Sequence, residues 1–278
     1  MEKCSPFREV PVVDKIQHSG PGDEIAIFDT DPDSIEKFGL CGYRDPEKPG
    51  YRQKLLWYGM RFREGMRIKV LHSRNNGTVG SIEYLPGEYA WRGVHAPGYM
   101  VIHCLFILKK NFKGKGHGSL MIEACEKDAL ARKMYGVAVV ASKSTWMAKK
   151  EVFLKNGYEV IEEAPPHYQL LVKRFRPGAP LPTFSGNWKE KLARYSKGLT
   201  LIHSDQCPCV FKAAAEIPPL AGKEFGIDPT IIKLTDCREA QDTPNPYGIF
   251  SIVWKGQLVA DHPVSKTRFR NILKALSK

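Results

Sequence analysis

The feature that most constrains the fold is a long apolar run followed almost directly by a glycine-rich segment. The run "GYMVIHCLFIL" (98–108) is apolar nearly throughout, which is typical of a central, buried strand. The segment "KGKGHGSLMIEAC" (113–125) places three glycines among two lysines and a histidine, just where a helix begins. A helix N-terminus has unpaired N–H groups and a partial positive charge, and glycines let the backbone approach a ligand closely. The sequence therefore predicts a strand, a turn and a helix that together bind an anionic ligand.

The spacing of these glycines excludes two common nucleotide-binding motifs. A P-loop ends in Gly-Lys-Ser/Thr, and no such triplet closes this segment. A dinucleotide fingerprint needs a third glycine at a fixed offset, which Gly116 and Gly118 lack. A different phosphate-binding motif is therefore needed.

The hexapeptide 113–118 follows the pattern [R/Q]-x-x-G-x-[G/A], with lysine in the first position. Together with the strand before it, it resembles the acetyl-CoA motif of the GNAT acetyltransferase superfamily. The later segment "VFLKNGYEV" (152–160) resembles that superfamily's "LYEKLGF" segment. The two motifs and the expected order of strands and helices extend this resemblance over residues 24–176.

The resemblance implies that acetyl-CoA is the acyl donor and that an amine, on a small molecule or a peptide, is the acceptor. It implies that backbone groups of Phe106, Ile107 and Leu108 pair with the pantetheine arm. It also implies that the backbone N–H groups of seven residues hold the pyrophosphate, namely Lys113, Gly114, Lys115, Gly116, His117, Gly118 and Ser119. Lys113 keeps the charge of the usual arginine but lacks its forked geometry.

The resemblance does not identify the catalytic acid and base that transfer to an amine requires. Many superfamily members protonate the leaving thiolate from a tyrosine, but Phe153 stands at that position and Tyr158 lies five residues later. A glutamate base would fall near Met100, and a histidine at Cys104. His103 is expected on the opposite face from Cys104, in a core or hydrogen-bonded role. Catalysis by water or backbone groups, and binding of coenzyme A without turnover, both remain open.

The segment "RPGAPLPTFSGN" (176–187) divides the chain. Its three prolines and two glycines cannot continue a helix or a central strand. We therefore expect an acetyltransferase domain over 1–176, a linker over 177–187 and a second domain over 188–278. The predicted fold class is α/β, because strands and helices are mixed in both domains.

Two segments before the linker bear on the site. In the helix predicted from "YRQKLLWYGMRF", Leu55, Tyr58 and Phe62 share one face, and Lys54 and Arg61 lie mostly elsewhere. The stretch "LPGEYAWRGVHAPGY" (85–99) is a long connection, and long loops tend to be functional. It either lines an acceptor site or forms a solvated flap; the side chains concerned are Glu88, Trp91, Arg92 and His95.

After the linker, "HSDQCPCVF" places Cys207 and Cys209 at the start of a helix. A cysteine at a helix N-terminus has a lowered pKa, so we expect a reactive Cys207. The order strand, cysteine, helix, strand, proline-containing loop, hairpin and helix is that of a thioredoxin-like fold, although the spacing is C-x-C and not C-x-x-C. The pair is a redox-active dithiol, a soft-metal ligand pair, or an ordinary thiol on an inherited scaffold or substrate-presenting domain.

The second domain also carries a more specific resemblance. The segments "CPCVFKAAAEIPPLA" and "EAQDTPNPYGIFSIVWKGQLVADHPVSKTRF" look like those of YoaP-type proteins. In these proteins a GNAT domain carries a small C-terminal domain of this kind. The resemblance implies no activity for that C-terminal domain.

Composition restricts the partners. The chain has 42 lysines and arginines against 30 aspartates and glutamates, a net charge of +12 that is spread along its length. A diffuse positive charge favours anionic ligands, but without a cluster or a matching motif it argues against nucleic acid. The sequence has no signal peptide, no membrane-length apolar run and only scattered cysteines. We therefore expect a cytoplasmic protein with free thiols and no bound metal.

Two functions follow from these features. The first is an acetyl-CoA-dependent N-acetyltransferase acting on an amine. The alternative is a non-catalytic CoA-binding protein, in which the domain that carries Cys207 and Cys209 has a thiol redox or metal-binding role.

Overall fold

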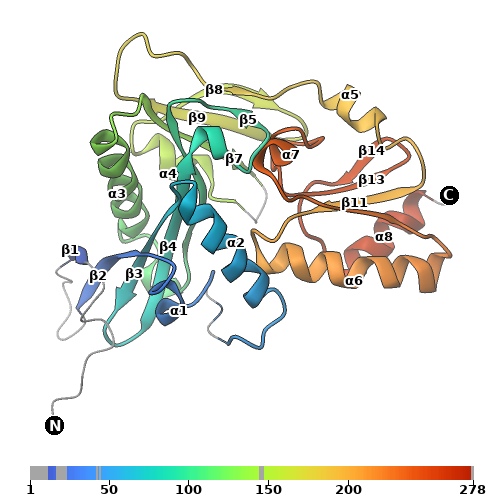
Figure 1. The fold of residues 1–278 in the computed structure, drawn as a ribbon, viewed down its shortest axis with the longest axis horizontal. Helices are drawn as coiled ribbons and strands as arrows, with labels where there is room; N and C mark the ends of the chain where they lie inside the picture. Colours follow the sequence, from blue (N-terminus) through green and yellow to red (C-terminus); the bar gives the residue numbers. More distant parts are fainter. Residues whose placement is uncertain (1–11, 17–23, 42, 44, 144–146, 277–278) are drawn as a thin grey trace.

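The computed structural model describes residues 12–16, 24–41, 43, 45–143 and 147–276. Two mixed sheets with helices around them form the core of the protein (Figure 1). The predicted α/β fold class is confirmed.

The N-terminal part is built on an eight-stranded sheet with the order β1-β2-β3-β4-β6-β7-β9-β8. Its strands are β1 (Val12–Ile16), β2 (Ile25–Thr30), β3 (Arg67–Ser73), β4 (Gly77–Pro86), β6 (Tyr99–Ile107), β7 (Gly136–Ser142), β8 (Glu159–Ala164) and β9 (Tyr168–Arg174). The apolar run predicted to be central is β6, which lies between β4 and β7. Strands β3 and β4 form a hairpin about the segment "RNNG".

Helices cover both faces of this sheet. Helices α3 (His117–Ala131) and α4 (Lys150–Leu154) pack on one face with Ile25, Ile27 and their neighbours. Helices α1 (Ile35–Phe38) and α2 (Tyr51–Arg63) pack on the other face. Strand β6 leads through α3 to β7, which runs parallel to it, so the glycine-rich segment lies at the start of the crossover helix.

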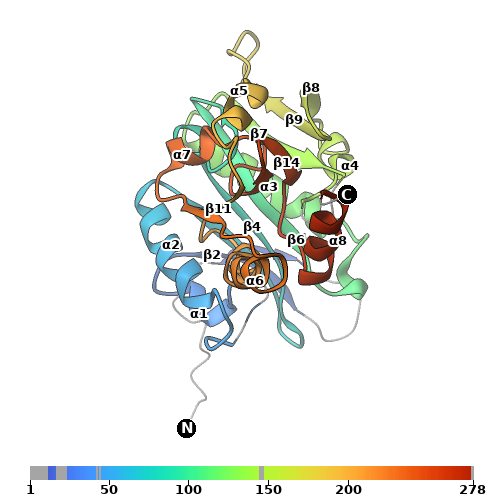
Figure 2. The ribbon, with the colours of Figure 1, turned by 90° about the vertical axis from the view of Figure 1, so that its right-hand side faces the viewer.

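The C-terminal part contains a four-stranded sheet of order β12-β11-β13-β14. Strand β12 is parallel to β11, and β13 is antiparallel to it. The elements are α5 (Trp188–Ala193), β11 (Leu199–His203), α6 (Pro208–Phe225), β12 (Thr230–Lys233), α7 (Cys237–Gln241), β13 (Phe250–Trp254), β14 (Gln257–Ala260) and α8 (Lys266–Leu276). Helices α6 and α8 contact each other on one side of this sheet (Figure 2). Ser265 caps α8, because its hydroxyl accepts a hydrogen bond from the Arg268 N–H.

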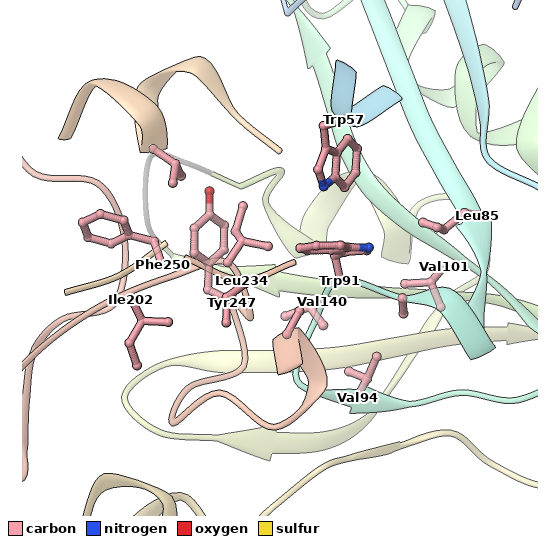
Figure 3. Close-up of a cluster of buried hydrophobic side chains, with 14 of the residues drawn as sticks. Trp57, Leu85, Trp91, Val94, Val101, Val140, Ile202, Leu234, Tyr247 and Phe250 are labelled. Atoms are coloured by element: carbon pink, nitrogen blue, oxygen red, sulfur yellow. The ribbon is translucent and has the colours of Figure 1, made fainter. Parts of the chain in front are cut away.

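The two parts share one hydrophobic cluster. Figure 3 shows Trp57 and Trp91 of the N-terminal part beside Tyr247, Leu234 and others from the C-terminal part. The rings of Trp57 and Trp91 meet edge to face, with their centroids 5.4 Å apart. The predicted linker is itself partly ordered, since β10 (Thr183–Phe184) pairs with β5 (Val94–His95).

The buried face of α2 differs from the prediction. Leu55 and Phe62 are half-buried, whereas Lys54 and Arg61 are buried together with Tyr58. The Arg61 guanidinium lies 4.8 Å from the centroid of the Trp91 ring. The amphipathic pattern alone was misleading, because buried partners on distant segments stabilise the two cations.

Close backbone contact at Gly248 provides a test of this packing. Gly248 has a φ of +78°, and a Cβ there would lie 2.6 Å from the Arg92 Cα. Gly178 has the same φ and no neighbour within 4 Å of such a Cβ. Both alanine substitutions place a side chain in the left-handed region, at a cost of about 1–2 kcal/mol.

We expect Gly178→Ala to lower the free energy of unfolding by about that amount. Gly248→Ala should cost about 1–3 kcal/mol more, because it also overpacks the junction of the two parts. Urea denaturation measures both. Equal losses would mean that the two backbones do not pack as closely as described.

Candidate active site

The glycine-rich segment has the backbone geometry that its glycines permit. Gly114 and Gly116 have φ angles of +74° and +83°, a region that L side chains rarely adopt. A Cβ at either position would meet nothing within 4 Å, so the backbone angle, and not a lack of space, favours glycine there. Gly116 is the N-cap of α3, which runs for 15 residues. The first N–H groups of α3 are therefore available to a ligand.

A cavity of about 550 Å³ lies between the end of β6, the glycine-rich segment and α4. Most of the residues predicted to hold acetyl-CoA line it: Phe106, Ile107, Lys113, Gly114, Gly116, His117, Gly118 and Ser119. Two predicted residues, Leu108 and Lys115, do not line it. Lys149 and Lys155 also face the cavity, and sequence reasoning missed them.

The edge of β6 explains why this cavity exists. On one side, Leu105, Phe106 and Ile107 pair with β4. On the other side, the pairing with β7 stops after Ile102. Beyond that residue the two strands separate, and no described strand pairs with this edge of β6. An extended ligand with amide groups can hydrogen-bond there as an additional strand would.

A second, small pocket lies in the fork between β6 and β7. It shares Leu105 and Ala148 with the large cavity. Its other lining residues are Ile102, His103, Cys104, Val139, Val140, Met147 and Phe153. Phe153 is fully buried, so the position expected to carry a tyrosine has only an apolar ring. Tyr158 packs edge to face against Phe153 and does not line the pocket.

A β-bulge changes the expected orientation of His103. Glu83 pairs with Cys104 and Tyr84 pairs with Ile102, so His103 is an extra residue in β6. The extra residue places both His103 and Cys104 on the face of the sheet that α2 covers. The prediction that the two side chains point to opposite faces is therefore wrong.

His103 nevertheless has the hydrogen-bonded core role that was predicted. Its Nε2 accepts a hydrogen bond of 2.8 Å from the Trp91 N–H, and its Nδ1 lies 3.1 Å from the Val101 carbonyl oxygen. An accepting Nε2 leaves the ring proton on Nδ1. Burial, followed by the charge of Arg92, holds the pKa of His103 well below its usual range. The ring is therefore neutral at pH 7.

Beside the bulge, a buried carboxylate joins several side chains. Glu83, opposite Cys104, accepts hydrogen bonds from the Lys54 ammonium at 3.0 and 3.3 Å. It also accepts hydrogen bonds from the Tyr58 hydroxyl and from the Cys41 thiol, the latter at 3.3 Å. Sequence reasoning missed this group, because the apolar pattern of the helix placed Lys54 away from the buried face.

Lys54 connects this group to the C-terminal part. Its ammonium donates a 2.6 Å hydrogen bond to the carbonyl of Gln206, the residue before Cys207. Burial lowers the pKa of Lys54, but electrostatic interactions with its neighbours, Cys41 and Glu83 foremost, outweigh burial and raise the pKa overall. Lys54 therefore stays charged.

The connection 85–99 makes a second bridge. Trp91 and Arg92 are buried. The Arg92 guanidinium donates to the His103 carbonyl at 2.5 Å and to Gln206 Oε1 at 3.0 Å. Glu88 and His95 are exposed. Trp91 and Arg92 were predicted to line an acceptor site or to belong to a solvated flap. Both predictions are wrong for these two residues, because their buried side chains join the two parts of the protein.

The cysteine pair lies at the start of α6, where it was predicted. Cys207 is the N-cap, and Cys209 lies in the first turn. The interaction with Cys207 has the largest effect on the pKa of Cys209, and it lowers that pKa. Tyr43, whose Oη is 3.8 Å from the Cys209 Sγ, lowers it further. Together these effects outweigh burial and bring the pKa of Cys209 to about 6. The same interaction, with burial, raises the pKa of Cys207. The acidic thiol is thus Cys209 and not Cys207.

Other expectations concern metals, thiols and membranes. Among the described residues, no group of three or more His, Cys, Asp or Glu side chains could hold a metal ion. The six described cysteines are free thiols. No helix in the described part of the chain is long and apolar enough to cross a membrane.

Comparison with known proteins assigns the family. A family described as YoaP-like matches residues 230–271. A Bacillus subtilis (strain 168) protein named "Uncharacterized N-acetyltransferase YoaP" is 30% identical over 249 residues, which cover 88% of this chain and 97% of that protein. The chain belongs to the YoaP family of N-acetyltransferases. It is therefore an acyltransferase.

Solved structures resemble about half of the chain. The PaiA N-acetyltransferase of Thermoplasma acidophilum, in complex with coenzyme A, is 15% identical with a TM-score of 0.39, over 54% of this chain and 99% of that one. A GNAT-family acetyltransferase of Staphylococcus aureus Mu50 is 11% identical with a TM-score of 0.39, over 55% and 99%. An acetyltransferase of Bacillus cereus is 15% identical with a TM-score of 0.37, over 54% and 99%.

The Lys54–Glu83 pair yields a quantitative prediction. Lys54→Met leaves the Glu83 carboxylate buried without its cation, so we expect a loss of about 3–5 kcal/mol in the free energy of unfolding. Lys54→Met combined with Glu83→Gln removes both charges and should recover much of that loss. A double-mutant cycle in urea measures the coupling. Additive losses would contradict a direct pair.

Proposed function

We propose that the protein transfers the acetyl group of acetyl-CoA to the amine of a small molecule or peptide. The observation that carries this proposal is the open edge of β6, which continues into the glycine-rich start of α3 within one cavity. An open strand edge suits the amides of pantetheine, and a helix N-terminus suits a pyrophosphate. The bound coenzyme in the solved structure of the Thermoplasma acidophilum protein agrees with this choice of donor.

The residues proposed to hold the coenzyme divide into two groups. Phe106, Ile107 and Leu108 offer backbone groups to the pantetheine arm. The Leu108 N–H already donates to the Val79 carbonyl at 2.8 Å, so Leu108 contributes at most its own carbonyl. The N–H groups of residues 113–119 hold the pyrophosphate, and the cationic side chains of Lys113, Lys149 and Lys155 add positive charge around the cavity.

With the coenzyme in this orientation, its thioester reaches the small pocket between β6 and β7. Phe153 cannot protonate the leaving sulfur. Cys104 lines that pocket, and a hydrogen bond to Cys41, followed by burial, raises its pKa well above the usual range. Cys104 is therefore a protonated thiol at pH 7, and its S–H can donate a hydrogen bond to the leaving sulfur at this end of the cavity.

We further propose that residues 188–278 form a thioredoxin-like domain, joined by the linker 177–187 to an acetyltransferase domain over 1–176. The strand order β12-β11-β13-β14 supports this fold, as does the antiparallel direction of β13. The element order β11, α6, β12, α7, β13, β14, α8 agrees with it. The two-residue strand β10 is the one regular element within the linker that the structure describes.

Gly118 offers a test that leaves the fold intact. A Cβ at this position would make only an ordinary 3.5 Å contact with Val152, and the φ angle is not in the left-handed region. Gly118→Glu adds a carboxylate where the pyrophosphate is expected, and Gly118→Gln adds the same bulk without the charge. Calorimetric titration should show that acetyl-CoA binds the native protein, binds Gly118→Gln more weakly and binds Gly118→Glu about 100-fold more weakly than the native protein.

Equal affinities of the two variants would contradict a pyrophosphate at this position. Release of coenzyme A in the presence of a panel of amines then tests turnover. Tight binding without release on any amine would favour a non-catalytic protein.

A further inference from the structure

The bulge residue of β6 needs a hydrogen-bond donor from outside the sheet. In the described strands β4 and β6, His103 is an extra residue without a partner residue. The pairing of β6 with β7 ends one residue earlier, at Ile102. The His103 carbonyl therefore lies outside both ladders, and the residue is buried. A buried carbonyl without a donor is costly, so the group that satisfies this carbonyl also stabilises the bulge.

The Arg92 guanidinium is that donor. It donates a hydrogen bond of 2.5 Å to the His103 carbonyl, and the neighbouring Trp91 N–H donates one of 2.8 Å to the ring of His103. These two contacts fix both the backbone and the side chain of the bulge residue. His103 and Cys104 line the small pocket together. The position of Arg92 therefore bears on how the bulge presents Cys104 to that pocket.

Arg92 is in turn held by neutral oxygens, although it is only 2% exposed. Besides the His103 carbonyl, it donates to the Trp91 carbonyl at 2.7 Å, to Gln206 Oε1 at 3.0 Å and to the Tyr247 carbonyl at 3.3 Å. A buried cation whose acceptors carry no full charge depends strongly on each of them. Two of these acceptors come from the C-terminal part, which thereby helps to hold the strand that lines the pocket.

Gln206 makes two separate contacts across the junction of the two parts. Its backbone carbonyl accepts a hydrogen bond of 2.6 Å from Lys54, and its side chain accepts the one from Arg92. The backbone next to Arg92 has a contact of its own, since the Gly93 N–H donates to the Pro246 carbonyl at 3.1 Å. Loss of the Gln206 amide would thus remove one acceptor of Arg92 and leave the backbone contacts between the two parts in place.

We propose that Arg92 is a positioning residue for acetyl transfer, and that Gln206 of the C-terminal part keeps it in the productive position. This inference rests on the proposed acetyltransferase function. Arg92 holds the bulge, and the bulge directs Cys104 into the pocket where the thioester is proposed to lie. The residues proposed to hold the pyrophosphate are at the other end of the large cavity. A small displacement of the bulge should therefore slow transfer without weakening the binding of acetyl-CoA.

Steady-state kinetics on the full chain test this, with acetyl-CoA as the donor and an amine that the native protein acetylates. Gln206→Met keeps the length of the side chain but removes the oxygen that Arg92 uses. We expect it to lower kcat about 10- to 100-fold and to leave the KM for acetyl-CoA unchanged. Gln206→Glu keeps an acceptor oxygen for Arg92 and should recover most of the loss in kcat.

Gln241→Met is the matched control. Gln241 also joins the C-terminal part to the connection 85–99, because its Nε2 donates to the Ala90 carbonyl at 3.1 Å and to the Glu88 carbonyl at 3.3 Å. The native kcat is expected for this variant. Urea denaturation and acetyl-CoA titration establish that each variant is folded and binds the donor. If Gln206→Met does not fold, Gln206→Asn takes its place, because the shorter amide withdraws the oxygen from Arg92, and its kcat should also fall.

The outcomes that would overturn the inference can be told apart. A native kcat in Gln206→Met would show that its contact with Arg92 does not position the site, and the proposed function would stand. Equal losses in Gln206→Met and Gln241→Met would assign the effect to the docking of the two parts in general. A raised KM with an unchanged kcat would assign Gln206 to donor binding. Absence of coenzyme A release by the native protein on every amine would remove the proposed function, and the inference with it.

Discussion

The buried ion pair of Lys54 and Glu83 is the interaction on which the arrangement of the site depends. A charged pair away from water is stable only when hydrogen bonds satisfy both groups, and here Tyr58, Cys41 and the Gln206 carbonyl do so. Each of these partners comes from a different segment. The pair therefore fixes α2 on the sheet and fixes the start of α6 against α2. Loss of either charge would affect the strand bulge and the cysteine pair together.

The parts of the fold that local pattern determines were predicted well. The apolar run became the central strand β6, and the glycine segment opened α3. Most of the residues predicted to hold the coenzyme line one cavity, because strand, turn and helix are adjacent in the sequence and their relative positions follow from their lengths. Their role in binding stays a prediction.

What depends on contacts between distant segments could not be predicted. The bulge at His103 has no signal in the sequence of β6, and it determines which side chains face the pocket. Arg92 was expected in an acceptor loop or a solvated flap, but it is buried by contacts with Gln206 and Tyr247, which lie more than a hundred residues later. The position of Cys207 at a helix start was correct. The prediction of a lowered pKa for Cys207 was wrong, because the interaction between the two cysteines raises the pKa of Cys207 and lowers that of Cys209.

We propose that the thioester of the coenzyme reaches the fork between β6 and β7, beside Cys104. A crystal structure with bound coenzyme A tests this most directly. The account predicts the pyrophosphate on the N–H groups at the start of α3, the pantetheine arm along Phe106 and Ile107, and the sulfur in the pocket that Cys104 lines. Coenzyme bound elsewhere, or with its sulfur directed away from the fork, would contradict it.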